Sequence, residues 1–288
     1  MSNGSAPEWV KPVMQAGYGA RGVTYVIVGA LAVLAAWRGG SAEGAQGALA
    51  QLRGEPLGLA ALVLIGLGFL AYAVWRLICA AYDLQNEGHD AKGVIARLGQ
   101  TATGVIHLGL GASVLRMAIG SGSGGGDSAP QSLTSKVLAM PNGKMIVMAL
   151  GLLVVAAGLY YGYKGLSEKY KENIRLTSVT ERLDPAVKAG LVAHGVVIVL
   201  IGVFLFYAGQ TADPGEAGGV GKAFEVVRAQ PFGRIMLGVL GLGTVGFAVY
   251  CFVEACYRVI PRLSGDEIST LASRAKSEAK RKARQAAH

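Results

Sequence analysis

Residues 20–25 read Ala-Arg-Gly-Val-Thr-Tyr, and the pattern returns as Ala-Thr-Gly-Val-Ile-His at 102–107 and as Ala-His-Gly-Val-Val-Ile at 193–198. In each copy a second glycine follows the first by seven residues, inside an apolar run. Seven residues are nearly two helical turns, so both glycines lie on one face and let another helix approach closely. We therefore expect six packing glycines: Gly22, Gly29, Gly104, Gly111, Gly195 and Gly202.

A second pattern follows each of these segments. A proline, one variable residue and a glycine open another apolar run at Pro56, Pro141 and Pro231, and a further glycine lies ten residues after each proline. A unit of two long apolar segments therefore occurs three times. The stretch before each proline has apolar residues three to five apart, which predicts a short helix on the outer membrane surface. Those residues are Leu49 and Leu52, then Leu133, Val137 and Leu138, then Phe224 and Val227.

The composition excludes a soluble core protein. The chain is 52% hydrophobic and 16% charged, whereas soluble domains are about 25% charged. Six stretches have the length of a membrane-spanning helix: 22–37, 57–82, 101–119, 145–163, 188–208 and 232–257. The first stretch also resembles a signal peptide, but its place in the repeat favours a retained span.

The predicted fold is all-α. It is an integral membrane six-helix bundle built from three parallel two-helix repeats, and a pseudo-threefold arrangement is the simplest way to pack them. We divide the chain into an N-terminal tail, three repeat units and a basic tail: 1–19, 20–83, 97–165, 188–262 and 263–288. The linker 164–188 is charged on both signs and predicts an amphipathic surface helix.

The basic residues predict the orientation. With the N-terminus inside, 19 of the 27 Lys and Arg residues lie in inner segments, so both termini are expected in the cytoplasm of a bacterium, with the chain in its inner membrane. The net charge of +9 then reflects topology and attraction of anionic lipids, chiefly to the basic C-terminal tail. Nucleic acid is not an expected partner, because no folded basic module is visible.

Ionisable residues inside apolar segments are functional candidates by default. His107 lies roughly 14 Å into the third span, near the midplane. It could relay protons or hold a ligand, but a neutral imidazole bonded to a nearby carbonyl or hydroxyl is favoured, since no deep acidic partner is present. Near the cytoplasmic ends, Arg21, His194, Lys164 and Glu254 predict an ion-pair layer in which Glu254 meets His194 or Arg21.

Two further patterns concern the helix ends and the cysteines. Aromatic residues gather where the second helix of each unit ends, which predicts an interfacial belt at the cytoplasmic surface: Tyr72 and Trp75, then Tyr160, Tyr161 and Tyr163, then Tyr250 and Tyr257. Cys79, Cys251 and Cys256 have no metal-binding or disulfide spacing. No hydrolase, metalloprotease or nucleotide-binding motif occurs, so we expect no enzyme activity, no cofactor and no metal.

The residues carry one resemblance. Residues 20–25 and the run Gly66-Leu-Gly-Phe-Leu-Ala-Tyr-Ala-Val-Trp-Arg76 resemble the bacterial membrane family catalogued as domain of unknown function twelve-oh-six. That resemblance implies three two-helix units and imports no activity. Mitochondrial carriers also use three two-helix units, but their Pro-x-acidic-x-x-basic motif is absent here, which leaves only an analogy of fold.

The sequence favours a structural or accessory membrane protein that associates with a membrane complex or with itself as a homo-oligomer. A channel or transporter for an ion or small solute, with its path along the repeat axis, is the alternative. An enzyme that acts on lipid has the least support. The first hypothesis leads because transporters usually carry broken helices or paired charges at the midplane.

Overall fold

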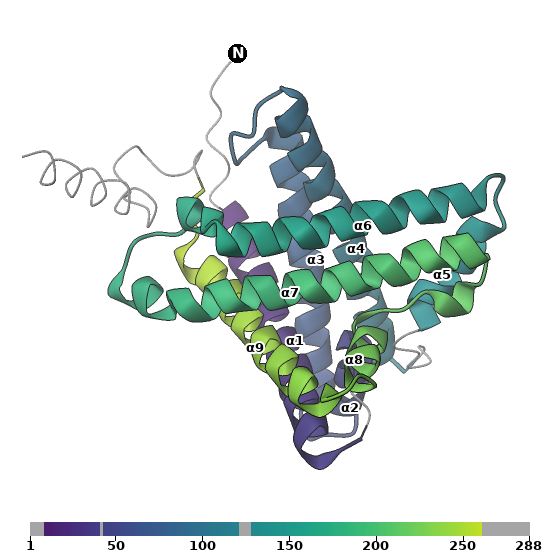
Figure 1. Cartoon of the computed structure of the whole chain (residues 1–288). Coiled ribbons are helices and arrows are strands. Elements are labelled where there is room, and N and C mark those ends of the chain that lie inside the picture. The colour runs from purple at the N-terminus through teal and green to yellow at the C-terminus, as the bar shows by residue number, and fades with distance from the viewer. Residues whose placement is uncertain (1–8, 41–42, 121–127, 261–288) are drawn as a thin grey trace, which may run out of the picture.

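The computed structural model describes residues 9–40, 43–120 and 128–260, and these residues form helices and no strand (Figure 1). The six long helices are α1 (Val10–Arg38), α3 (Gly58–Tyr82), α4 (Ala91–Ala118), α6 (Gly143–Leu166), α7 (Ser178–Thr211) and α9 (Gly233–Tyr257). The shorter elements are α2 (Ala45–Leu52), α5 (Ser128–Leu138), α8 (Val220–Arg228) and the 3₁₀ turns η1 (Lys169–Asn173) and η2 (Pro214–Glu216). The predicted tail 263–288 lies outside the described residues.

Five of the long helices, α1, α3, α6, α7 and α9, are long and apolar enough to cross a membrane. The predicted third span, 101–119, corresponds to the C-terminal part of α4, which ends at Ala118. That helix is not among those with the required hydropathy; its apolar part, 98–115, contains four glycines and the polar residues Gln100 and His107. The all-α class is therefore confirmed, whereas a sixth crossing stays a prediction.

The first helix of every repeat begins about ten residues earlier than its apolar stretch. The helices start at Val10, Ala91 and Ser178, whereas the apolar stretches start at 22, 101 and 188. Local capping explains two of these starts. The side chain of Asp90 accepts a hydrogen bond from the amide of Gly93 at 2.9 Å, and Thr177 forms a capping box with Thr180. The linker 164–188 is therefore not a separate surface helix but the end of α6, η1 and the first turns of α7.

Each predicted short helix is present, and each is followed by the same turn. In the sequence Pro-x-Gly, the glycine amide donates to the carbonyl of the residue before the proline, at 2.8–2.9 Å in all three copies. The middle residues Leu57, Asn142 and Phe232 have left-handed φ values of 65°, 57° and 60°, as in a type II turn. The second helix of each unit consequently begins at the glycine and not at the proline.

The helices pair between repeats. α1 packs on α9, α4 on α3, and α7 on α6, so the first helix of each unit lies against the second helix of another. All six predicted packing glycines lie at these three interfaces. A Cβ atom added at Gly29, Gly111 or Gly202 would lie 2.8, 3.0 or 2.9 Å from a glycine carbonyl oxygen of the partner helix. Those partners are Gly241, Gly66 and Gly151, the glycines that follow the prolines by ten residues.

The two helices of one repeat pack together in the first and third units only. α1 contacts α3 and α7 contacts α9, whereas α4 and α6 make at most a marginal contact. The helices thus follow the order α4, α3, α1, α9, α7, α6 as an open row. The α6 and α7 pair also runs across the direction of α3 and α4 (Figure 1). A closed pseudo-threefold bundle is therefore not confirmed.

One position that is equivalent in the three repeats differs in α6, at the open end of the row of helices. Gly68 of α3 and Gly243 of α9 let these helices approach alanines of α1 and α7. The equivalent residue of α6 is Leu153, which is 66% exposed. The second repeat therefore lacks the small residue at which α3 and α9 approach the first helix of their own unit.

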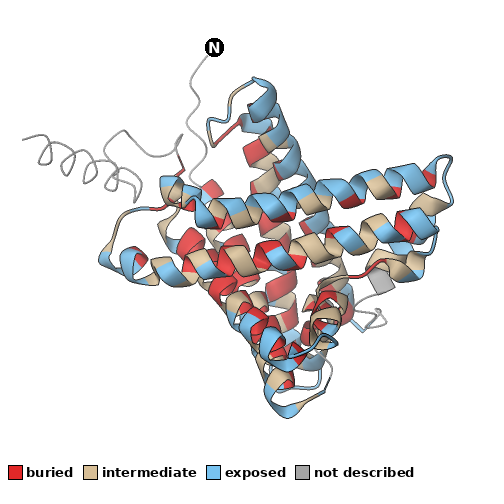
Figure 2. Cartoon of the chain, in the orientation of Figure 1, coloured by how far each residue is buried: buried red, intermediate tan, exposed pale blue. Residues whose placement is uncertain are grey.

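The core lies where α1, α3, α7 and α9 meet, and α6 is largely exposed (Figure 2). The predicted aromatic belt is wrong for two repeats, because Tyr72, Trp75 and Tyr250 are buried in this core. Val10 and Met14, which lie in α1 before its predicted apolar stretch, belong to the same buried cluster as these rings. Tyr160 and Tyr163 of the second repeat are exposed.

Replacing Gly29 with alanine should lower the free energy of unfolding by about 1–3 kcal/mol, because the added methyl would overlap the backbone of α9. Gly109 is the matched control. It lies inside α4 with nothing within 4 Å of an added Cβ, so Gly109→Ala should be neutral or stabilising by up to about 1 kcal/mol. Thermal unfolding in detergent measures both, and equal melting temperatures for the two variants would contradict the interface.

Candidate functional site

A buried arginine forms the centre of the site. Arg21 lies near the middle of α1 and is 4% exposed. Its Nη1 donates to the hydroxyl of Tyr72 on α3 at 2.6 Å. The guanidinium carbon lies 4.5 Å from the ring centre of Tyr72, 5.5 Å from that of Phe247 on α9 and 5.8 Å from that of Tyr25. Three aromatic faces therefore stabilise the charge.

His107 and His194, which the sequence marks as candidates, both lie at this site. His107 of α4 lies 4.6 Å from Tyr72 between ring centres, and its Nδ1 is 2.8 Å from the carbonyl oxygen of Thr103. His194 of α7 stacks on Phe247 at 3.7 Å. The predicted hydrogen bond of His107 to a carbonyl is therefore present. We define the Arg21 cluster as Arg21, Tyr25, Tyr72, His107, His194 and Phe247.

The predicted ion-pair layer is not formed. Glu254 is fully buried and pairs with Arg258, one helical turn further along the chain, and not with His194 or Arg21. Lys164 donates to the hydroxyl of Tyr250 at 2.8 Å. The reason is that an i, i+4 partner is available without any tertiary contact, whereas Arg21 and His194 lie deeper among the aromatic rings of the Arg21 cluster.

A small cavity adjoins the Arg21 cluster. It has a volume of about 40 Å³, and Leu49 of the short helix α2 lines it together with residues of α1, α3 and α4. Its polar lining residues are Arg21, Thr24, Tyr25 and His107. The buried Nε of Arg21 has no hydrogen-bond partner. Sequence reasoning missed this cavity, because its walls come from four separate helices.

Within residues 9–40, 43–120 and 128–260, no group of His, Cys, Asp and Glu side chains could hold a metal ion. Cys79 and Cys251 are free and buried, and Cys256 is free and exposed.

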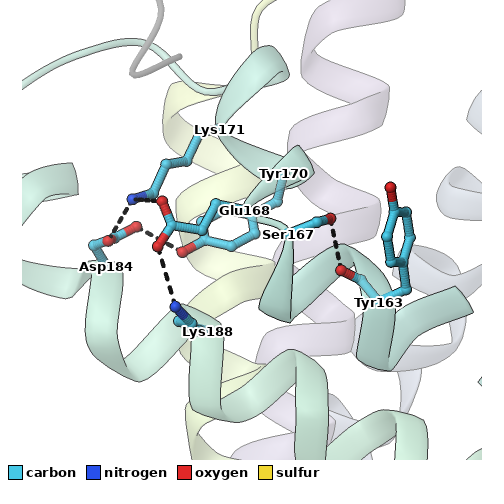
Figure 3. Close-up of polar contacts among 7 residues, drawn as sticks. All are labelled: Tyr163, Ser167, Glu168, Tyr170, Lys171, Asp184 and Lys188. Carbon is cyan, nitrogen blue, oxygen red and sulfur yellow. Dashed lines mark hydrogen bonds and ion pairs between the residues drawn. The ribbon is translucent and has the colours of Figure 1, made fainter. Parts of the chain in front are cut away.

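Ion pairs connect the end of α6 to the start of α7 (Figure 3), and we call their residues, Glu168, Lys171, Asp184 and Lys188, the polar corner. Lys171 lies 2.7 Å from Glu168 and 2.8 Å from Asp184, and Lys188 lies 3.1 Å from Glu168. Hydrogen bonds from the two lysines lower the pKa of Glu168. Although burial lowers the pKa of Lys171, its bonds to Asp184 and Glu168 raise it more, so the net shift is upward. Burial and a hydrogen bond to Asp184 raise the pKa of Tyr170.

Comparison with known proteins gives a family but no activity. The model of the family described as Domain of Unknown Function (DUF1206) matches the chain three times, over residues 16–83, 98–168 and 189–258. A relative from Bacillus subtilis (strain 168), described as "Uncharacterized protein YxxB", is 27% identical over 254 residues, which cover 87% of this chain and 92% of the relative. No solved structure matches.

Replacing Tyr72 with phenylalanine should destabilise the protein by about 1–3 kcal/mol, because the guanidinium of Arg21 would lose its acceptor in a buried site. Tyr161→Phe is the control, since the Tyr161 ring also packs near this site, edge-on to His194 at 5.0 Å, but its hydroxyl makes no hydrogen bond to Arg21 in the structure. Thermal unfolding in detergent compares the two variants. An equal loss in both would contradict a specific role for the Tyr72 hydroxyl.

The polar corner predicts a pH window for stability. The pKa of Glu168 is lowered by folding, so its contribution is present above about pH 4.5 and is lost as pH falls further. The pKa of Lys171 is raised, so its contribution is present below about pH 10.5 and is lost as pH rises. Lys171→Met should lower stability by about 0.5–1 kcal/mol between these limits and flatten the profile. Melting curves from pH 3 to 11 that coincide for both proteins would refute this.

Proposed function

We propose that this chain, which belongs to the family described as Domain of Unknown Function (DUF1206), is a non-enzymatic membrane protein that acts by associating with other membrane chains. Five helices with the length and hydropathy of membrane spans support a multi-pass protein. The three matches to the family model support three repeats of one plan.

Our proposal includes six crossings, with α4 as the third span. Because every repeat contributes two long helices, an even number of crossings keeps both termini on one side. The excess of Lys and Arg in the inner segments supports a cytoplasmic position for both ends, in the inner membrane of a bacterium. The basic C-terminal tail is then available to anionic lipids.

The open edge formed by α4 and α6 carries the functional proposal. In the first and third repeats, Gly17 and Gly190 lie against the backbone of the second helix of the same unit. The equivalent residue of the second repeat is Gly99, which has nothing within 4 Å of an added Cβ. A small-residue face that receives a helix in two repeats is thus unoccupied in the third.

The occupant that fits best is a second copy of this chain. Each copy carries both halves of the missing contact, the Gly99 face of α4 and the exposed Leu153 side chain of α6. Two copies related by a twofold axis would each place α6 on the α4 of the other, so both edges would be covered at once. Such self-association is the structural role expected from the sequence.

A channel or transporter is the second candidate, and the Arg21 cluster favours it. A buried guanidinium inside a membrane-spanning helix commonly marks a substrate or ion pathway. The adjoining cavity, at about 40 Å³, is small for a path through the protein. For this reason association ranks above transport.

Disulfide crosslinking in native membranes tests the association. Gly99→Cys is combined with Ala157→Cys, the α6 residue equivalent to Tyr72 and Phe247, in a chain that carries Cys256→Ser. Oxidation should give a covalent dimer on a non-reducing gel. The control pairs Ala157→Cys with Val105→Cys, an exposed residue about 120° away around α4, and should remain monomeric.

Four results would overturn the proposal of a homodimer. A crosslink within one chain would mean that α4 and α6 close on each other. An adduct of another mass would identify a different partner protein. Monomer alone, or equal dimer in the control, would leave the Gly99 face without a role in association.

A further inference from the structure

We propose that the cavity beside Arg21 binds one small inorganic monoanion, of the size of chloride or nitrate. The cavity lies between α1, α3 and α4, beneath the short helix α2. This inference is independent of association through α4 and α6, because the cavity lies inside a single chain and includes no residue used in the crosslinking test.

Uncompensated charge is the first argument. Arg21 is 4% exposed, yet among the described residues no acidic side chain lies within ion-pair distance of its guanidinium. The contrast within the same protein is Arg258, whose buried side chain pairs with Glu254. Buried charges in proteins are usually paired or neutralised. Tyrosine and phenylalanine faces offset part of the cost at Arg21 but supply no negative charge.

The hydrogen-bond inventory is the second argument. Nη1 of Arg21 donates to Tyr72, whereas Nε is buried without a partner and Arg21 lines the cavity. An arginine side chain has only donors, so the missing partner is an acceptor. The hydroxyl group of Tyr25, another lining residue, can act as a second donor. The Thr24 hydroxyl already donates to the carbonyl of Ala20 at 2.9 Å.

Size and lining define the class of ligand. A volume of about 40 Å³ holds about three or four water molecules at about 10–15 Å³ each, or one small anion. Sugars, nucleotides and acyl chains are too large. The remaining walls are apolar, chiefly Phe69, Leu110 and Val114, so an ion in the cavity would be largely shielded from water and its attraction to Arg21 would be strong.

The test is thermal unfolding of the full chain in detergent at constant ionic strength. The reference salt is sodium gluconate, whose anion is too large for the cavity. Sodium chloride, sodium bromide or sodium nitrate then replaces it. We expect the small anions to raise the melting temperature. At an anion concentration about 100 times the dissociation constant, the unfolding equilibrium should shift by about a hundredfold. Identical melting curves in gluconate and in all three small anions would mean that the cavity holds only water, and would overturn the proposal.

Two variants separate a specific site from a general salt effect. Arg21→Met removes the charge and should abolish the difference between chloride and gluconate. Val114→Leu keeps Arg21 and adds a methylene to the cavity wall, so it should also abolish the difference, and it remains informative if Arg21→Met does not fold. Val147→Leu makes the same change at a buried site on α6, so this variant should retain the difference between chloride and gluconate. An anion effect that persists in Val114→Leu would refute binding in this cavity.

Discussion

The close backbone contact between glycines of different repeats is the constraint on which the structure depends. Inside a bilayer the lipid tails are as apolar as a leucine side chain, so helices associate by close packing and not by the hydrophobic effect. A Cβ atom added at Gly29, Gly111 or Gly202 would lie 2.8–3.0 Å from a glycine carbonyl oxygen of another repeat, closer than ordinary van der Waals contact. Each of these three contacts joins helices of different units.

This pairing also creates the candidate site. Because α1 lies between α3 and α9, Arg21 meets Tyr72 on one side and Phe247 on the other. α4 and α7 then bring His107 and His194 to the same rings. A charge that would be costly in lipid is thus held by a hydroxyl group and by aromatic faces. Its unpaired Nε leaves the cluster able to take one more acceptor.

The second repeat departs from the plan of the other two, and its departures coincide with the open edge. Leu153 stands where the other repeats have a glycine, and Gly99 faces no neighbour. The first and third repeats enclose the core, whereas α6 is exposed along most of its length (Figure 2). Where α6 is followed by α7, the ion pairs of Lys171 with Glu168 and Asp184 stabilise the turn between the two helices (Figure 3).

Sequence alone determined the features that depend on local chemistry and on periodicity. These features are the helical class, the threefold unit, the short helices before the prolines, the packing glycines and the family. The capping residues Asp90 and Thr177 also indicate that α4 and α7 begin before their apolar stretches. The polar composition of these first turns, however, favours a linker over a helix. Only the tertiary structure decided which helix each glycine face meets, because a glycine face specifies a close approach and not a partner. It also placed Arg21 among aromatic rings of α3 and α9, since burial by other helices arises only when separate helices come together.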